Sequence, residues 1–334
     1  MRQIQAAYYE VNGPANEVIK RGSVAIPDMD EHAILVRILA SGVNPSDVKT
    51  RAGLRGKMIT PFIIPHSDGA GIVEEIGRRV TRFKPGDRVW VYNAAWERPY
   101  GTAAEYTMLP EALIEPLPEQ LSFEQGACLG IPALTAASCL LCLSKLQGKT
   151  IVVTGGAGGV GNIAIQLAKH NGATVITTVS SEKKSLIAKQ VGADAVINYR
   201  NSDVAEEMKR LTRGEGVDLI VDVDFGANLS WTIAALKTGG HIASYASGSL
   251  PRPELPFYEM MFKGISLYTI LVYRLSDETR RQAITMVDRA MRDNALHPLI
   301  GAVFPLENIV QAHEAVEQQS TIGQVIVSVQ SKNI

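Results

Sequence analysis

The sequence has little cysteine, with only three residues in a chain of 334. Three cysteines cannot form the disulfide framework of a small secreted protein, and this usage is typical of a reducing compartment. The N-terminal residues lack the apolar core of a signal peptide, and no run of about 18 uninterrupted apolar residues occurs, so no membrane span is expected. We therefore expect a soluble protein of the cytosol.

An excess of either charge is also missing, because 33 Lys and Arg residues face 34 Asp and Glu residues, for a net charge of −1. Such a balance provides no field that attracts nucleic acid or an anionic membrane, so a small molecule or another protein is the expected partner. Hydrophobic residues make up 46% of the chain, as in ordinary globular proteins. A chain of this length predicts two domains.

The pattern of apolar residues changes along the chain. Short β-rich runs separated by Gly, Pro and Asp predict an all-β, partly barrel-like unit in the N-terminal third. From residue 150 onward strands and helices alternate, which is typical of a doubly wound parallel sheet. Since this unit is flanked on both sides, we expect the tail to rejoin the N-terminal domain. The main runs are strands at 33–39, 71–76, 88–92, 103–109, 150–154 and 323–329, and helices at 133–145, 162–170, 277–292 and 306–318.

A glycine-rich turn connects the predicted strand at 150–154 to the following helix. Gly156, Gly158 and Gly161 fill the pattern GxGxxG in a strand–turn–helix context, which is far more specific than the pattern alone. Glycine lets the backbone approach a pyrophosphate, and the first amides of the helix face its negative charge. The turn, including Gly159 and Val160, therefore predicts a dinucleotide site rather than a merely structural turn.

The end of the next strand lacks a carboxylate. Sites that prefer NAD place Asp or Glu there, roughly 20 residues on, to accept a hydrogen bond from the ribose. This chain has Ser180 and Ser181, followed by Glu182, Lys183 and Lys184. Hydroxyl groups followed by lysines attract a 2′-phosphate, so the sequence predicts NADPH rather than NADH. The preference weakens if the lysines only solvate the helix start or if Glu182 points into the site.

Segments along almost the whole chain resemble one known family. They are residues 40–47, 67–73, 84–89, 130–136 and 196–200, together with the glycine turn. On these segments the chain is similar to the medium-chain dehydrogenase/reductase superfamily, in its zinc-independent quinone oxidoreductase (zeta-crystallin) branch. The resemblance implies an α/β fold with a Rossmann doubly wound parallel sheet (125–268) inserted in a GroES-like β-rich catalytic domain (1–124 and 269–334).

The same resemblance implies roles for individual residues. Lys184 and Tyr199 fall at positions that commonly hold the 2′-phosphate, and Asn44 and Thr135 fall near the nicotinamide. The segment that contains Tyr245 and Ser247 follows a sheet strand and is expected to line the same crevice, where open α/β sheets bind ligands. Relatives pair the strand that corresponds to residues 266–272 across a two-fold axis, so we expect a homodimer.

No metal site is expected. Zinc-dependent relatives carry a Cys and a His-Glu pair in segments where this chain has Asn44 and, further on, Ser67 and Asp68, and neither Asn44 nor Ser67 is a donor that zinc prefers. Cys139 and Cys142 form a CxxC without a second pair, inside an apolar helical run, which favours buried helix cysteines over metal or redox chemistry. His66 is interpreted as a loop or core histidine.

These observations favour an acceptor that needs no metal activation. A quinone, or the β-carbon of an α,β-unsaturated carbonyl compound, takes hydride from NADPH when it is held in line. Asn44 is the only candidate catalytic residue, as an orienter of the nicotinamide or of a substrate carbonyl. Lys49 and Arg55 stand where relatives often present tyrosines, and with Arg51 they either favour an anionic substrate or form a solvated basic loop. Two alternatives stay open: an enoyl-thioester or alkenal reductase, and a non-catalytic NADPH-binding protein of the crystallin or sensor type.

Overall fold

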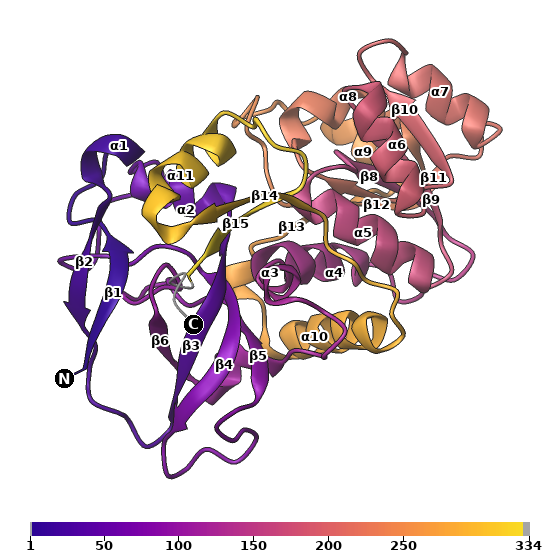
Figure 1. The fold of residues 1–334 in the computed structure, drawn as a ribbon. Coiled ribbons are helices and arrows are strands. Elements are labelled where there is room, and N and C mark those ends of the chain that lie inside the picture. Colours follow the sequence, from indigo (N-terminus) through magenta and orange to yellow (C-terminus); the bar gives the residue numbers. More distant parts are fainter. Residues whose placement is uncertain (1, 330–334) are drawn as a thin grey trace. The chain divides into compact units, whose positions relative to one another are not determined.

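The structure is a computed structural model that describes residues 2–329. The chain divides into two compact units, called unit 1 (Met1–Ile131 with Pro298–Ile334) and unit 2 (Pro132–His297) (Figure 1). The domain limits predicted above, 124/125 and 268/269, lie at other positions and stay a prediction. Residues 269–297 fall in unit 2 because α10 (Asp277–Arg292) packs against α4 (Leu134–Leu140) and α5 (Gly159–His170).

Unit 1 is built on a seven-stranded, mostly antiparallel sheet. The strand order is β14-β15-β3-β4-β5-β7, and β6 also pairs with β3; only β14 and β15 are parallel neighbours. The strand β3 is buried along nearly its whole length, as its apolar run requires. A separate antiparallel pair, β1 and β2, completes the strands of unit 1. Their bounds are β1 Gln3–Tyr8, β2 Lys20–Ala25, β3 Ala33–Val43, β4 Asp68–Ile76, β5 Arg88–Val91, β6 Tyr106–Pro110, β7 Ile114–Pro116, β14 Ile300–Pro305 and β15 Gln324–Ser328.

Within residues 2–329, four short α-helices accompany this sheet. They are α1 (Ala15–Val18), α2 (Pro45–Arg51), α3 (Phe123–Gly126) and α11 (Ile309–Glu317). Helix α2 starts directly after β3, because Pro45 suits the first helical position and the Asp47 carboxylate accepts a hydrogen bond from the Asn44 backbone N–H. Helix α11 packs against α2 and β15, and its Glu317 pairs with Arg51 at the end of α2, the helix that follows Asn44.

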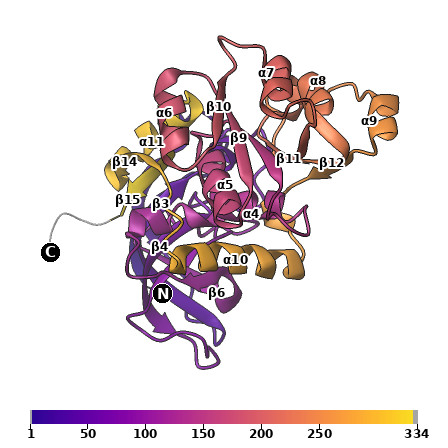
Figure 2. The ribbon, with the colours of Figure 1, turned by 90° about the vertical axis from the view of Figure 1, so that its right-hand side faces the viewer.

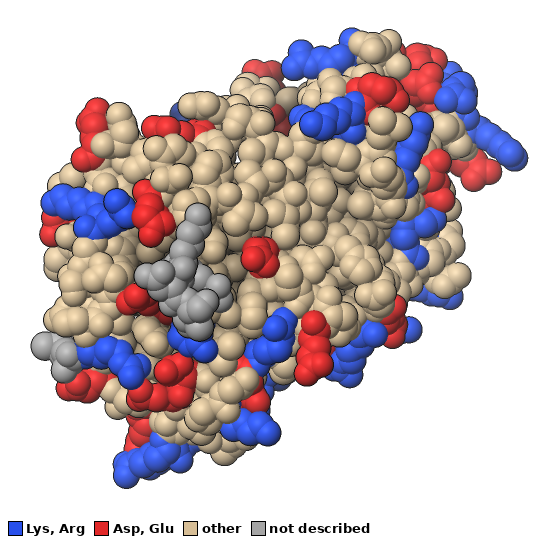
Figure 3. Space-filling model, in the orientation of Figure 1, with Lys and Arg blue, Asp and Glu red and all other residues tan. Residues whose placement is uncertain are grey.

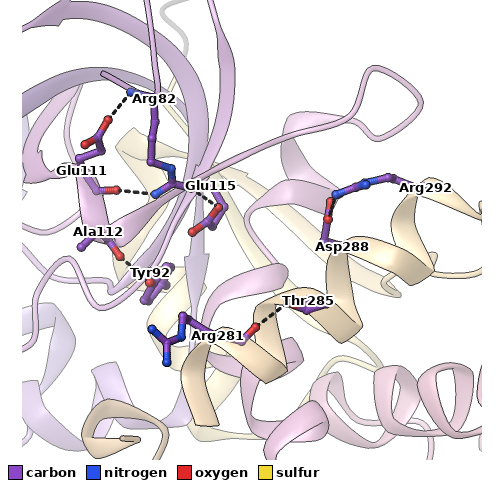
Figure 4. A network of polar contacts seen from close by, with 9 residues as sticks. All are labelled: Arg82, Tyr92, Glu111, Ala112, Glu115, Arg281, Thr285, Asp288 and Arg292. Carbon is purple, nitrogen blue, oxygen red and sulfur yellow. Dashed lines mark hydrogen bonds and ion pairs between the residues drawn. The ribbon is translucent and has the colours of Figure 1, made fainter. Parts of the chain in front are cut away.

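Polar contacts at the surface of unit 1 join its loops to β7 (Figure 4). Arg82 donates from its backbone to the Glu111 carboxylate at 2.6 Å and from its guanidinium to Glu115 at 2.6 Å. The Tyr92 hydroxyl donates to the carbonyl oxygen of Ala112. Exposed pairs of this kind contribute little free energy individually, so they orient loops rather than hold the fold.

Unit 2 contains a six-stranded sheet in the order β10-β9-β8-β11-β12-β13, and every neighbouring pair is parallel. This order and the alternating helices confirm the predicted Rossmann doubly wound sheet. The order reverses between β8 and β11, where such sheets bind ligands. The elements are β8 Thr150–Thr154, β9 Thr174–Val179, α6 Glu182–Gln190, β10 Ala195–Asn198, α7 Val204–Leu211, β11 Val217–Asp222, α8 Phe225–Ala235, β12 Leu236–Ser244, α9 Phe257–Lys263 and β13 Ser266–Thr269.

The strands of unit 2 are covered on both faces, as their continuous apolar runs predict. Val152, Ile220 and Ile242, from three neighbouring strands, are fully buried in one cluster. Helix α9 packs against β12, next to the edge strand β13 (Figure 2). Basic and acidic side chains intermingle over the region of α6 and α7 (Figure 3), as the balanced composition suggests. Within residues 2–329 no helix combines the length and apolarity that a bilayer crossing requires.

Candidate cofactor and active site

The glycine turn of unit 2 has a geometry that only glycine permits at several positions. A Cβ added at Gly161 would lie 2.3 Å from the carbonyl oxygen of Gly155, and one added at Gly156 would lie 2.1 Å from Thr177 Oγ1. Gly155 itself has a φ of 68°, in the left-handed region. The backbone of the turn therefore folds tightly against the start of α5.

The start of α5 is suited to an anion. Its N-cap is Gly158, which is exposed and provides no capping side chain, and the first turn, with Gly159 and Val160, contains no acidic residue. The first backbone N–H groups of the helix therefore have no internal partner, and the helix dipole favours negative charge there. These residues fit the pyrophosphate of a dinucleotide.

The residues predicted to hold a 2′-phosphate lie at one edge of the sheet. Lys184 Nζ donates to Ser180 Oγ at 3.0 Å, and Ser181 caps α6 by accepting from the Lys184 backbone. The backbone N–H of Tyr199 donates to the Val179 carbonyl, which places Tyr199, 47% exposed, beside the end of β9. A hydroxyl, an ammonium group and an exposed phenol ring therefore border this edge, and no carboxylate ends β9.

The remaining predicted residues of unit 2 differ in the exposure and the hydrogen bonding of their side chains. Thr135 lies on α4 and is 4% exposed. Tyr245 follows β12, and burial of its hydroxyl raises the pKa above the ordinary value although the residue as a whole is half-buried. The Ser247 hydroxyl donates to the Leu250 carbonyl at 2.6 Å and accepts from the Gly226 N–H at 2.9 Å, so it joins its own loop to the start of α8.

Sequence reasoning missed Asp222, which ends β11 beside the point where the strand order reverses. Its Oδ1 accepts hydrogen bonds from Thr154 Oγ1 at 2.9 Å and from Asn228 Nδ2 at 2.7 Å. Burial raises its pKa. The carboxylate thus ties the end of β8 to the end of β11. The only indication in the sequence was an Asp at the end of an apolar strand, where open parallel sheets bind ligands.

Asn44, the candidate catalytic residue, lies in unit 1 and is 2% exposed. Its Nδ2 donates to Asp68 Oδ2 at 2.7 Å, and its Oδ1 accepts from Gln324 Nε2 at 2.9 Å. Its backbone N–H donates to Asp47 Oδ2 at 2.8 Å. Sequence reasoning named none of these three partners as site residues, because they come from β4, β15 and α2.

The two carboxyl groups beside Asn44 are both buried. Burial is the main cause that raises the pKa of Asp47 to about 7. Burial, and then the charge of Asp47, raise the pKa of Asp68 well above its ordinary value. Asp68 nevertheless accepts hydrogen bonds from Asn44 and from the Ile131 N–H, which is 2.9 Å from each carboxylate oxygen. These donors favour the ionised form and oppose burial.

The residues at the position of the zinc ligands do not fit a zinc ion. The Asn44 carboxamide and the Asp68 carboxylate are bonded to each other, and both accept further N–H donors, whereas zinc sites use thiolate, imidazole or free carboxylate donors. Among residues 2–329 no group of three His, Cys, Asp or Glu side chains is placed to hold a metal ion.

The other residues weighed from the sequence occupy buried positions. His66 is fully buried, as expected of a core histidine, and its Nε2 lies 3.0 Å from Nε2 of His313. The sequence interpretation of Arg51, as part of a solvated basic loop or of a site for an anionic substrate, is wrong. The residue is fully buried. Its guanidinium is buried and bonded to Glu317 and to the Gly13 carbonyl, because α11 covers this face of α2.

The CxxC cysteines have the environment expected of packing residues. Cys139 is buried within α4, and Cys142, just beyond the helix end, is half-buried; neither is in a disulfide. Burial raises the pKa of Cys142 to about 11, so its thiol is protonated at neutral pH and a poor nucleophile.

Comparisons with known proteins agree with this architecture. A model of the alcohol dehydrogenase GroES-like domain matches residues 30–119, and a model described as zinc-binding dehydrogenase matches residues 159–289. A quinone oxidoreductase of Sus scrofa is 34% identical over 323 residues, which cover 96% of this chain and 95% of that protein. A 2-haloacrylate reductase of a Burkholderia species is 28% identical over 331 residues, covering 96% and 98%.

Among solved structures, a mycobacterial protein in complex with NADPH superposes with a TM-score of 0.84 at 28% identity, covering 97% of this chain and 100% of that one. The fold, the glycine turn and these matches define a pyridine-nucleotide-dependent oxidoreductase of the medium-chain dehydrogenase/reductase type. Within that class, the chain belongs to the quinone oxidoreductase family.

Proposed function

We propose that this protein is an NADPH-dependent reductase that transfers hydride to a quinone or an activated α,β-unsaturated carbonyl compound without zinc. The observation that carries the cofactor choice is the 3.0 Å contact between Lys184 Nζ and Ser180 Oγ at the end of β9. An ammonium group and a hydroxyl there bind a phosphate, whereas a ribose hydroxyl needs a carboxylate acceptor.

NADPH supplies the hydride, and the residues of the chain bind the cofactor and orient the reacting groups. The turn through Gly156, Gly158 and Gly161 takes the pyrophosphate at the start of α5. Ser180, Lys184 and the exposed face of Tyr199 take the 2′-phosphate. Asn44 orients the nicotinamide or the acceptor carbonyl through its carboxamide, with Thr135 and the segment from Tyr245 to Ser247 as further contacts.

The absence of zinc chemistry in this proposal is supported by the donor set. Asn44 and Ser67 are poor zinc donors, and the amide of Asn44 is committed to Asp68 and Gln324. A quinone or an enone accepts hydride without a strong Lewis acid, so positioning supplies much of the rate. The similarity to the quinone oxidoreductase of Sus scrofa supports the quinone as the first choice of acceptor.

The test is the oxidation of NADPH and of NADH with a panel of quinones, enones and enoyl thioesters. The proposal predicts turnover on quinones or enones with a ratio of NADPH to NADH catalytic efficiency well above one. A ratio below one contradicts the cofactor choice. Unchanged turnover of an Asn44→Ala variant contradicts the proposed role of Asn44 in the active site.

A reductase of acrylate-type, alkenal or enoyl-thioester substrates is the second candidate. The observation that favours it is the charge of Arg55, which partly offsets the burial that raises the pKa of the Asp47 carboxyl group beside Asn44. A cation near the site suits an anionic acceptor, and a haloacrylate, the substrate named for the Burkholderia relative, is one. Turnover only on unsaturated acids or thioesters supports this candidate. NADPH binding without turnover on any of them supports a non-catalytic role.

We further propose that the protein forms a homodimer and is cytosolic. The strand β13 is the edge of the six-stranded sheet, and Tyr268 on it and Leu271 just after it are 38% and 43% exposed. The neighbouring α9 leaves Phe257 and Phe262 65% and 79% exposed, and an open edge beside apolar side chains suits a second copy of the chain. A monomeric mass in solution scattering contradicts the dimer, and fractionation of cells tests the location, which the free cysteines support.

A further inference from the structure

The carboxamide of Asn44 is held at both ends by partners that allow only one orientation. Gln324 Nε2 donates at 2.9 Å both to the Val43 carbonyl oxygen and to Asn44 Oδ1. Because a carbonyl oxygen only accepts, the amide of Gln324 must present its nitrogen here, and Asn44 must present its oxygen to Gln324. The nitrogen of Asn44 then points to Asp68, which is the contact found at 2.7 Å.

Asp68 sits in a space made for a carboxylate that accepts. A Cβ added at Gly130 would lie 2.1 Å from Asp68 Oδ1, and a Cβ added at Gly42 would lie 3.2 Å from Asp68 Cβ. The Ile131 N–H points between the two carboxylate oxygens, 2.9 Å from each. Asp68 is fully buried, so neither solvent nor a counterion replaces these donors. Two glycines and one backbone N–H therefore fix the group that receives the Asn44 N–H.

Asp47 adds a third contact to this clamp. It engages the Asn44 side chain besides accepting from the Asn44 backbone N–H, so Asp68, Gln324 and Asp47 together fix the carboxamide. A carboxamide with a fixed direction offers a donor and an acceptor at set places, whereas a freely rotating one offers them in either order.

We propose that Asp68 and Gln324 are positioning residues that set the direction of the Asn44 carboxamide for hydride transfer. The proposal rests on the proposed function, in which Asn44 orients the nicotinamide or the acceptor carbonyl. Neither residue touches the reacting atoms. Both act on the rate through Asn44, and Gln324 does so from β15, at the other end of the chain from β3.

The decisive variant is Gln324→Glu, which keeps the shape of the side chain and replaces the donor by oxygens. A carboxylate there faces two acceptors, the Val43 carbonyl and Asn44 Oδ1, so the amide of Asn44 loses its fixed direction. We expect kcat to fall about 10- to 100-fold, as for a misplaced orienting group. The dissociation constant for NADPH, measured by fluorescence titration, should stay within about twofold, since the phosphate contacts lie in unit 2. Gln311→Glu, on the exposed side of α11, is the matched control and should leave kcat unchanged.

The effect of Gln324→Glu on kcat, measured with and without the Asn44 side chain, distinguishes a positioning role from a merely structural one. In an Asn44→Ala background, Gln324→Glu should lower kcat by no further factor, because the group that it positions is gone. Asp68→Asn, which points an amide N–H at either Asn44 or Ile131, should behave in the same way. If Gln324→Glu unfolds, Gln324→Met removes the donor while keeping the packing and provides the same comparison.

The outcomes separate the two proposals. A wild-type protein without turnover on any acceptor overturns the proposed function and this inference with it. Wild-type turnover with an unchanged kcat in both the Gln324 and the Asp68 variants overturns the inference alone. An equal loss of kcat with and without the Asn44 side chain also overturns it, since these residues would then act on something other than Asn44.

Discussion

Replacing Asp47 by Asn should remove a large part of the pH dependence of the folding free energy. Asp47 is 6% exposed at the start of α2, and burial raises the pKa of its carboxyl from 3.8 to about 7. In the unfolded chain the group loses its proton near the lower value. Between the two values the folded protein binds more protons than the unfolded chain, so stability falls as the pH rises.

The expected magnitude follows from the size of this shift. About three pKa units, at 1.36 kcal/mol each, amount to roughly 4 kcal/mol in total. Roughly 3 kcal/mol of this is lost between about pH 5 and about pH 8. Asn keeps the oxygen that accepts from the Asn44 N–H but carries no charge. Relative to the wild type, Asp47→Asn should therefore gain about 3 kcal/mol of unfolding free energy over this pH range.

Urea unfolding of both proteins, followed by circular dichroism at several pH values, measures this difference. Burial lowers the pKa values of His66 and His313, which act in the opposite sense below pH 6.5, and their effect cancels because both proteins contain them. Asp277→Asn, at a side chain that is 87% exposed, is the control for the loss of one negative charge at a helix start. A difference between Asp47→Asn and the wild type that does not change with pH would refute the reasoning.

Three further variants test the cofactor site and the core of unit 1. Lys184→Ala should raise the KM for NADPH about 10- to 100-fold and leave that for NADH unchanged, because a charge-assisted contact to the 2′-phosphate is lost; steady-state kinetics measure both. Gly161→Ala, whose Cβ would lie 2.3 Å from a carbonyl oxygen, should weaken NADPH binding in a fluorescence titration by at least about tenfold. Arg51→Met should lower the unfolding free energy in urea by about 2 to 4 kcal/mol, since the buried guanidinium holds a loop carbonyl and a carboxylate.

Each of these variants has a control and a contrary result. Lys183→Ala, at an exposed neighbour, should leave both KM values unchanged. If Lys184→Ala raised the KM for NADH as much as that for NADPH, Lys184 would not select NADPH over NADH. Gly22→Ala, where the added Cβ makes only ordinary contact at 3.7 Å, should bind NADPH normally. Wild-type stability of Arg51→Met would show that the contacts of the buried guanidinium, including the ion pair with the exposed Glu317, only offset its desolvation.

Local patterns in the sequence were enough to predict unit 2. The strand and glycine turn before α5 and the amphipathic α10 depend on neighbouring residues, and the helix predicted at 277–292 has the same limits in the structure. The helix predicted at 133–145 ends earlier, at Leu140, because the apolar run that suggested it continues beyond the last helical residue. Periodicity reports the burial of one face but not the residue at which a helix ends.

The surroundings of Asn44 were beyond local patterns. Gln324 reaches Asn44 because β15 pairs with β3, and no spacing in the sequence reports a contact between residues 280 positions apart. Arg51 was misjudged for the same reason, since only the packing of α11 on α2 shows that its face of the helix is covered. Such contacts follow from strand pairing and helix packing between distant segments.

The pairing of β15 with β3 also sets an order of events during synthesis. All of unit 2 is synthesised before β15, so β3 is made long before the strand that pairs with it at this edge. Each doubling of the intervening chain adds only about 0.6 kcal/mol to the cost of closing the loop, so the delay is kinetic rather than energetic. A nascent chain stopped before residue 324 thus contains the complete glycine turn but lacks the residue that hydrogen-bonds the Asn44 carboxamide oxygen.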